Sequence, residues 1–145
     1  MTRTIPVSFP GGVRVETRLG AHTVVTDQLP VHGGTDAGPS PYDLFLASVA
    51  TCAGFYAAAF CQARKLSTEG LALGLEVEED EASHLPKAMT VHLTLPQGFP
   101  DQYRAAILRA VENCKVKKSI AAAPVTRVLF AKESQLAPQH TSSCL

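Results

Sequence analysis

The fold of this chain is decided by the stretch GPSPYDLFLASVATCAGFYAAAFCQA, residues 38–63. Its last twenty residues carry no charged side chain, and Cys52 lies in the middle of them. Ser40 can cap a helix that begins at Pro41, and Asp43 completes a Ser-x-x-Asp capping pattern. We therefore predict a helix that runs from Pro41 to about Leu66 and is apolar on all sides.

An apolar run of this length could also form a transmembrane helix, which needs about 20 residues. Seven of the twenty residues from Leu44 to Ala63 are alanine, however, which is only weakly apolar, and Ser48, Thr51 and Gln62 interrupt the run. A single membrane span would also leave the amphipathic segments elsewhere in the chain without a role. The better interpretation is a helix buried on every side of a soluble protein, and no membrane partner is expected.

Segments on both sides of this helix alternate between apolar and polar residues, which predicts half-buried antiparallel strands. Before the helix, residues 13–19 and 22–27 form a predicted hairpin with its turn at Gly20-Ala21, and Thr4 to Phe9 can add another strand. After the helix, residues 71–77 and 89–95 alternate in the same way, with an acidic connection between them. Val125 to Ala131 is the last predicted strand.

A second helix is predicted to start at Asp101. Tyr103, Ile107, Ala110 and Cys114 follow at spacings that place them on one buried face of this helix. The element order is thus β-β-α-β-β-α-β, which indicates an α+β fold with antiparallel pairing. We predict a single domain over residues 1–133 and a flexible tail over residues 134–145.

Composition limits the functions that this chain can have. Lys+Arg and Asp+Glu both number 13, so nothing favours a nucleic-acid partner. The four cysteines, at positions 52, 61, 114 and 144, are too few for a disulfide-stapled secreted module, and the N-terminal residues lack the pattern of a signal peptide. We therefore expect a cytoplasmic protein. The histidines show no metal-ligand spacing with the cysteines, and no phosphate-binding loop is present, so no metal or cofactor is expected.

Two of the cysteines, Cys52 and Cys114, suggest redox chemistry if the fold brings them together. A thiolate can attack an oxidant and become a sulfenic acid, which a second thiol converts to a disulfide. The attacking thiol needs a nearby cation or hydrogen-bond donor to ionise near neutral pH. The alternative is that both cysteines are small buried hydrophobic residues. Cys61 lies about 180° around the helix from Cys52 and is predicted only to pack in the core.

The segment from Gly38 to Leu44, together with Cys52, resembles the helix signature of the OsmC/Ohr family, the osmotically inducible and organic hydroperoxide resistance proteins. Gly20-Ala21-His22, Asp27 and Cys114-x-Val116 also match members of its OsmC-like branch. The resemblance implies an intertwined homodimer in which antiparallel sheets pack around long central helices. It also implies a thiol-dependent peroxidase that reduces organic hydroperoxides. Its reductant would be a dithiol, often carried by a lipoyl-bearing protein.

The same resemblance assigns roles to individual residues. Cys52 matches the peroxide-reactive cysteine and Cys114 the resolving one. Tyr42 takes the place of the family's glutamate, so Asp43 is the nearest carboxylate. The loop over residues 29–40 lacks the family's arginine, which makes Arg18 the first candidate for the activating cation, ahead of Arg14 and Arg3.

The predicted catalytic set is therefore Cys52, Cys114, Asp43 and Arg18, with Asp43 and Arg18 orienting one another and the thiolate. One further departure is Lys115, which follows the second cysteine where the family usually has proline. The alternative function is a non-catalytic dimeric module that binds a small apolar ligand, in which the cysteines only pack.

Overall fold

The computed structural model describes residues 2–130, which form two compact units. Among the described residues, the first unit contains residues 2–43 and 125–130, and the second runs from Leu44 to Pro124. The single domain predicted over residues 1–133 stays a prediction. The tail predicted over residues 134–145, with Cys144, lies outside the described residues.

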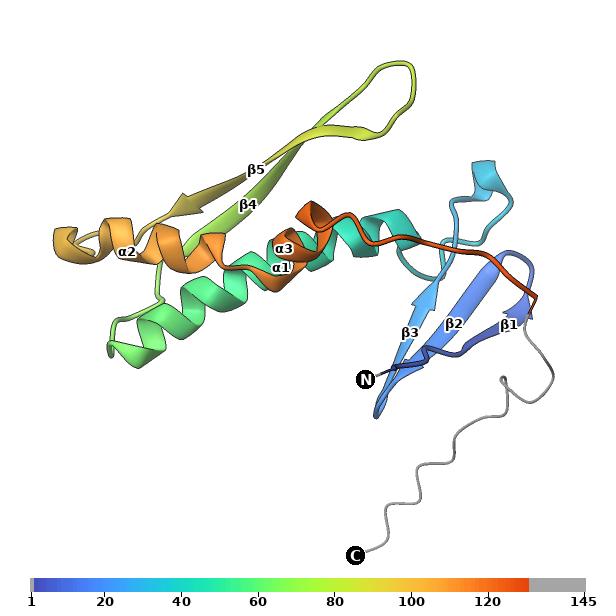
Figure 1. Cartoon of the computed structure of the whole chain (residues 1–145), viewed down its shortest axis with the longest axis horizontal. Coiled ribbons are helices and arrows are strands. Elements are labelled where there is room, and N and C mark those ends of the chain that lie inside the picture. The colour runs from blue at the N-terminus through green and yellow to red at the C-terminus, as the bar shows by residue number, and fades with distance from the viewer. Residues whose placement is uncertain (1, 131–145) are drawn as a thin grey trace, which may run out of the picture. The chain divides into compact units, whose positions relative to one another are not determined.

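The first unit contains a three-stranded antiparallel sheet, shown in blue in Figure 1. Its strands are β1 (Val7–Gly11), β2 (Arg14–Leu19) and β3 (His22–Thr26), in that order. Strands β2 and β3 pair from Leu19 opposite His22 to Val15 opposite Thr26, and Gly20 makes the turn with a φ of 64°. The predicted hairpin is confirmed, whereas β1 begins three residues later than the strand predicted from Thr4.

A short 3-10 helix, Pro30–His32, precedes the long helix α1 (Pro41–Ala63). The predicted capping pattern is present at the start of α1. The Ser40 hydroxyl oxygen accepts a hydrogen bond from the backbone N–H of Asp43 at 3.1 Å, and the Asp43 carboxylate accepts one from the Ser40 hydroxyl at 2.7 Å. The first of these bonds satisfies a backbone donor at the start of α1 that has no partner within the helix.

The end of α1 comes three residues before the predicted position at Leu66. The backbone N–H of Leu66 binds the carbonyl of Cys61 at 2.9 Å, and that of Lys65 binds the carbonyl of Gln62 at 3.2 Å. Lys65 has a φ of 56°, in the left-handed region. Together these features make a Schellman motif, which closes the helix at Ala63 and turns the chain toward the next strand.

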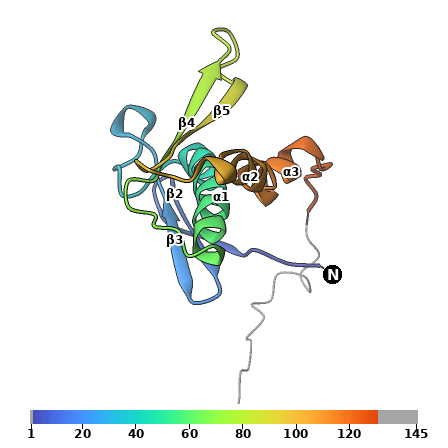
Figure 2. The same cartoon turned by 90° about the vertical axis from the view of Figure 1, so that its left-hand side faces the viewer.

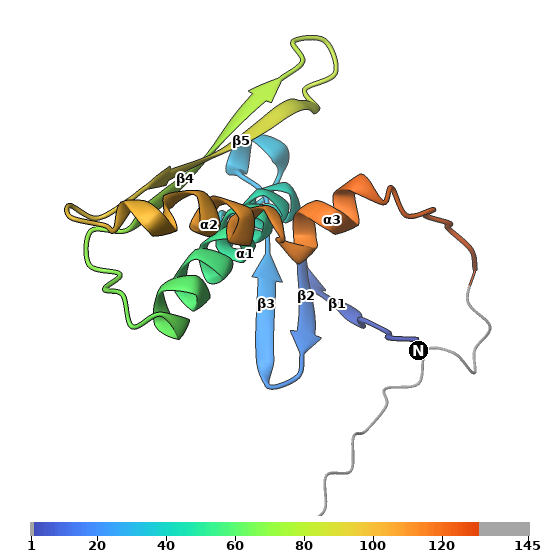
Figure 3. The ribbon, with the colours of Figure 1, turned by 60° about the vertical axis from the view of Figure 1, so that its left-hand side comes forward.

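The second unit contains a two-stranded sheet and two further helices (Figure 2). Strand β4 (Ala72–Glu79) pairs antiparallel with β5 (Pro86–Thr94), and the predicted alternation is confirmed because Leu73 and Leu93 face each other on the inner side. Helix α2 (Asp101–Glu112) lies beside α1 and runs in the opposite direction (Figure 3). A short helix, α3 (Lys115–Ala121), follows it.

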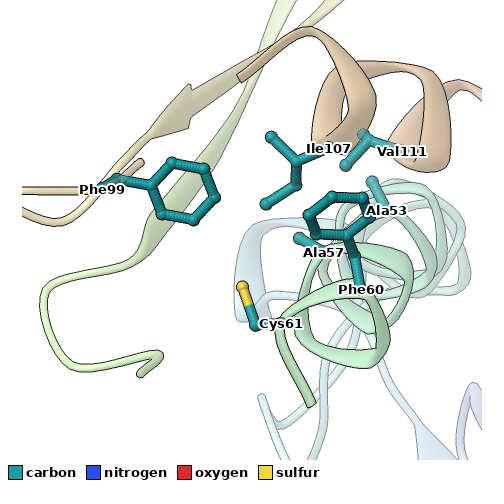
Figure 4. Close-up of a cluster of buried hydrophobic side chains, with 7 residues drawn as sticks. All are labelled: Ala53, Ala57, Phe60, Cys61, Phe99, Ile107 and Val111. Carbon is teal, nitrogen blue, oxygen red and sulfur yellow. The ribbon is translucent and has the colours of Figure 1, made fainter. Parts of the chain in front are cut away.

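The core of the second unit forms where α1 meets α2. Phe60 from α1 and Ile107 from α2 approach each other there, and Phe99 closes one side (Figure 4). Cys61 belongs to this cluster and has no exposed surface, which confirms its predicted packing role. The full set of buried residues in the cluster is Ala53, Ala57, Phe60, Cys61, Phe99, Ile107 and Val111.

Within the single chain, helix α1 is covered on one face only, so the expected burial of its other sides stays a prediction. Its buried residues, from Val49 to Cys61, repeat at helical spacing along one stripe, while Phe55 is 64% exposed. Within residues 2–130, α1 is also the one helix long and apolar enough to cross a membrane by length and composition, a test that core helices of soluble proteins also pass.

The strand predicted over residues 125–131 is wrong for residues 125–130, which have no regular secondary structure. Val125, Val128, Leu129 and Phe130 are all more than 80% exposed. A strand exists only where a neighbouring strand accepts and donates its backbone hydrogen bonds. The apolar composition that led to the prediction is real, but within residues 2–130 no strand pairs with this segment.

Candidate active site

Cys52 lies in the middle of α1 and meets the junction between α2 and α3. Its sulfur is in hydrogen-bond contact with the Cys114 thiol and with the backbone N–H groups of Lys115 and Val116. Cys52 is half-buried, Cys114 is fully buried, and both are free thiols. The structure therefore brings together the two cysteines that were predicted to form a pair, within one compact unit.

The position of Cys114 differs from the prediction that placed it on the buried face of α2. Helix α2 ends at Glu112, and Cys114 lies in the break before α3 with an extended backbone, φ −48° and ψ 123°. The break matters because the first N–H groups of a helix have no acceptor within it. At the start of α3, two of these groups, from Lys115 and Val116, act to lower the pKa of the Cys52 thiol.

The two thiols of the pair have opposite acidities. Burial raises the pKa of Cys52, but the hydrogen bonds from the Cys114 thiol and the N–H groups of Val116 and Lys115 outweigh it, so the net pKa lies below that of an ordinary cysteine. Burial and the hydrogen bond donated to Cys52 raise the pKa of Cys114. Cys52 is thus the thiol that ionises first, and Cys114 is the protonated donor beside it.

Cys61 provides an internal comparison for this site. It lies on the same helix as Cys52, and burial raises the pKa of its thiol without any hydrogen bond to offset the effect. A buried thiol in apolar surroundings is ordinarily unreactive. The difference between Cys52 and Cys61 therefore comes from the donors at the α2–α3 junction and not from the helix itself.

The remaining two predicted site residues, Asp43 and Arg18, belong to the first unit. The Asp43 carboxylate is engaged in the cap of α1, where it accepts hydrogen bonds from both the hydroxyl and the backbone N–H of Ser40. Arg18 lies on β2 opposite Thr23 with an exposed side chain, and the described residues contain no ion pair between it and Asp43. Arg14, the second candidate, lies 3.7 Å from the Glu16 carboxylate. Their roles toward Cys52 stay predictions.

The sequence profile described as OsmC-like protein matches residues 33–128, a range that includes both cysteines of the pair. The chain belongs to the OsmC-like family. No curated protein sequence matches the chain.

Solved structures share the fold of this OsmC-like protein. A proposed osmotic stress induced and detoxification response protein from Psychrobacter arcticus 273-4 superposes with a TM-score of 0.67 at 18% identity, covering 82% of this chain and 88% of that one. A structural genomics protein gives a TM-score of 0.62 at 17% identity, with 83% and 91% covered. The organic hydroperoxide resistance protein OsmC from Legionella pneumophila superposes with a TM-score of 0.50 at 23% identity, covering 83% of this chain and 90% of that one. These likenesses establish an OsmC-like α+β fold with antiparallel sheets.

No role was predicted from the sequence for two groups of the OsmC-like chain. The first is the pair of backbone N–H groups at the start of α3, whose only sequence signal is Asn113, a residue type that often ends helices. The second is Asp27, which is 2% exposed. Its carboxylate accepts hydrogen bonds from the backbone N–H groups of Gln28, Thr35 and Ala37 and from the Thr35 hydroxyl, at 2.8 to 3.1 Å.

Asp27 organises the loop between β3 and α1. The hydrogen bonds from Ala37, Thr35 and Gln28 hold the pKa of its carboxyl far below the ordinary value. Gly34 is required in the same loop, since a Cβ at this position would lie 1.8 Å from the carbonyl oxygen of Gln28. Asp27 was recognised only as a match to the OsmC-like branch, and its partners across the loop show that its role in the first unit is to hold residues 28–37 in one conformation.

In the part of the chain that the structure describes, no group of three or more His, Cys, Asp or Glu side chains gathers in a way that could hold a metal ion. In the second unit, hydrogen bonds outweigh burial and lower the pKa of Cys52, whereas burial and the hydrogen bond to Cys52 raise the pKa of Cys114.

Proposed function

We propose that this OsmC-like protein is a thiol-dependent peroxidase that reduces organic hydroperoxides through Cys52 and Cys114. The observation that carries the proposal is the asymmetry of the thiol pair. One thiol has a lowered pKa and is half-exposed, while the other is buried, protonated and hydrogen-bonded to it. A nucleophile needs to be ionised and accessible, and a resolving thiol needs to be close to it. A pair of cysteines that only packed in the core would need neither difference.

The reaction would proceed in three balanced steps. The Cys52 thiolate attacks the outer oxygen of the hydroperoxide and becomes a sulfenic acid. The O–O bond breaks, and the alkoxide that leaves takes a proton from solvent water to become the alcohol. The Cys114 thiol then displaces the hydroxyl group from the Cys52 sulfur, which forms the disulfide and releases water. A dithiol finally reduces the disulfide to two thiols and is itself oxidised to a disulfide.

Further parts of the proposal rest on the family. We assign Arg18 as the cation that stabilises the thiolate and Asp43 as the carboxylate that orients it, and we take the working unit to be an intertwined homodimer. The reductant is a dithiol, such as a lipoyl-bearing protein, and the compartment is the cytoplasm. The exposed apolar side chains of β1 and of residues 125–130 support the dimer, because a second copy could cover them.

The test is mass spectrometry after addition of one equivalent of an organic hydroperoxide such as tert-butyl hydroperoxide. A disulfide between Cys52 and Cys114 is expected, with consumption of hydroperoxide that Cys52→Ser abolishes and the control Cys61→Ala retains. Full consumption by Cys52→Ser would disprove the peroxidase proposal. If no disulfide forms and Cys52 reacts with a thiol reagent as slowly as Cys61, the non-catalytic module that binds an apolar ligand becomes the better account.

A further inference from the structure

The second unit contains an open cleft of about 480 Å³ between α1 and α2. Its apolar lining combines small and aromatic side chains, with Ala59, Ala106 and Ala110 beside Tyr56 and Phe60. The small alanine side chains leave the space, and Tyr56 and Phe60 form the aromatic part of the wall. A lining of this kind suits a flat apolar body better than a branched or strongly polar one.

The charged groups of the cleft are all positive. Arg64 and Arg109 line it, and the lining contains no carboxylate. Within residues 2–130 neither arginine forms an ion pair with an acidic side chain, although Arg104 of the same helix α2 binds Asp101 at 2.8 Å. Two guanidinium groups without a counter-charge make the cleft complementary to an anion.

The guanidinium of Arg64 is held in position over the cleft. It lies 3.8 Å from the centre of the Phe60 ring and 5.7 Å from that of Tyr103, which is a cation–π arrangement, and it also donates to the Phe60 carbonyl at 3.5 Å. A guanidinium that is stacked in this way loses less freedom when it binds a carboxylate or phosphate in a bidentate manner. At the α2 side, Asn113 lines the cleft and its side-chain oxygen accepts a hydrogen bond from Lys118 at 2.9 Å, which adds a third positive charge nearby.

The cleft adjoins the thiol pair without including it. Tyr56 and Ala59 lie four and seven residues after Cys52 and therefore on the same face of α1. On the opposite side, Asn113 directly precedes Cys114. The thiols thus lie where the middle of α1 meets the end of α2, and the arginines lie farther along. Arg64, just past the end of α1, is twelve residues beyond Cys52, or roughly 18 Å at the rise of a helix.

We infer that this cleft is a binding site for an amphipathic anion, namely a flat apolar body that carries a carboxylate or phosphate group. The aromatic and alanine side chains receive the apolar body, and Arg64 and Arg109 bind the anionic group. The inference does not depend on the peroxidase chemistry, because binding requires neither thiol to react.

The experiment compares three probes by isothermal titration calorimetry on the full chain: 2-naphthoate, the neutral 2-naphthamide of the same shape, and inorganic phosphate alone. We expect 2-naphthoate to bind roughly fivefold or more tightly than 2-naphthamide, and Arg64→Gln and Arg109→Gln each to reduce that preference severalfold. Phosphate alone should bind more weakly than 2-naphthoate if the apolar lining contributes. Phosphate binding as tight as that of 2-naphthoate would overturn the amphipathic part of the inference.

The matched control is Arg104→Gln. It removes the same charge from the same helix, but its arginine is paired with Asp101 and does not line the cleft. It should leave the preference for 2-naphthoate unchanged. The inference is overturned if the naphthoate and the naphthamide bind equally, if neither binds, or if Arg104→Gln weakens binding as much as the cleft variants do. Circular dichroism of each variant verifies that the helices remain folded.

Discussion

At the scale of single residues, this protein turns one of two cysteines on the same helix into an acidic thiol. Cys52 and Cys61 both lie on α1. Burial alone raises the pKa of Cys61, whereas three hydrogen-bond donors lower the pKa of Cys52. The Cys114 thiol is one of those donors, so it prepares the nucleophile before it resolves the oxidised product. A single side chain thus has two proposed roles that can be separated experimentally.

The first prediction separates the two roles of Cys114. Cys114→Ala removes both the donor and the resolving thiol, whereas Cys114→Ser keeps a donor but cannot form a disulfide. We expect Cys114→Ala to raise the Cys52 pKa and to slow its alkylation at neutral pH by roughly two- to tenfold, the equivalent of one hydrogen bond. Cys114→Ser should stay near wild type in alkylation.

Alkylation kinetics followed across pH measure this difference. In both variants the sulfenic acid of Cys52 should persist after peroxide treatment and be trapped by a dimedone reagent. If Cys114→Ala alkylates as fast as wild type, Cys114 does not lower the Cys52 pKa. If wild type and both variants trap equally, Cys114 is not the resolving thiol.

At the scale of secondary-structure elements, the break between α2 and α3 is the feature that makes the site. A continuous helix through Cys114 would use the N–H groups of Lys115 and Val116 for its own hydrogen bonds. The break frees them, and they bind the sulfur of Cys52. The start of α3 therefore stabilises the thiolate through backbone N–H groups. Only substitution by proline removes such a group.

Lys115→Pro tests this backbone contribution. Lys115 is the first residue of α3, where proline is tolerated, and Cys114 already has the extended backbone that a following proline requires. The substitution deletes one N–H donor to Cys52 and should raise the Cys52 pKa. Lys115→Ala is the control, since it removes the lysine charge but retains the N–H group. Equal thiolate titrations, followed by ultraviolet absorbance, for the two variants would show that the donor contributes nothing.

The loop between β3 and α1 yields a prediction on pH. The pKa of Asp27 is lowered in the folded protein, so its contribution to stability is present above the carboxyl's unfolded pKa, near 4, and is lost as the pH falls below it. Asp27→Asn removes the charge and should lower the melting temperature at pH 7 by several degrees, with a smaller difference from wild type at pH 2 to 3. Thermal unfolding across this pH range measures it. Asp36→Asn, an exposed carboxylate in the same loop, is the control.

A melting-temperature difference between Asp27→Asn and wild type that does not depend on pH would contradict the proposed role of the ionised carboxylate. A loss of stability in Asp36→Asn of the same size would attribute the effect to general charge in the loop. The expected pattern, with a pH-dependent loss in Asp27→Asn alone, follows from the four hydrogen bonds that only the buried carboxylate accepts.

At the scale of the whole molecule, one chain leaves much apolar surface without cover. The uncovered side of α1 exposes Phe55, β1 exposes Phe9, and residues 125–130 expose Phe130. Exposed apolar surface of this extent marks interaction sites. A second copy of the chain is the partner that the proposed function requires, and the interface would be of the large, apolar, obligate kind.

Equilibrium sedimentation at low micromolar concentration should therefore show a dimer. Phe55→Lys should weaken association at least about tenfold, because burying a phenylalanine side chain contributes roughly 1.5–3 kcal/mol and a lysine in its place would lose that contribution. Leu85→Lys is the matched control, since Leu85 is 63% exposed against 64% for Phe55 but lies in the connection between β4 and β5. A folded, stable monomer of the wild-type chain would contradict the homodimer.

The elements that could be predicted are those encoded by neighbouring residues. The Ser40–Asp43 cap, the alternation of Leu73 and Leu93 in their strands, and the burial of Cys61 depend on spacing along one element, and the structure agrees with each. The approach of Cys52 and Cys114 was expected from the family resemblance, and it is present. Local patterning is sufficient for the cap, the strand alternation and the burial of Cys61, because helices and strands have fixed periods.

Tertiary structure alone decided the features that depend on contacts between distant residues. The donors to Cys52, the hydrogen bonds from Thr35 and Ala37 to Asp27, and the arginine-lined cleft each join groups whose proximity no local period encodes. Residues 125–130 have strand-like composition but no strand, because composition favours an extended backbone whereas a strand needs a partner to complete its hydrogen bonds. Propensity is a property of the chain, while hydrogen-bond partners and acidity are properties of its packing.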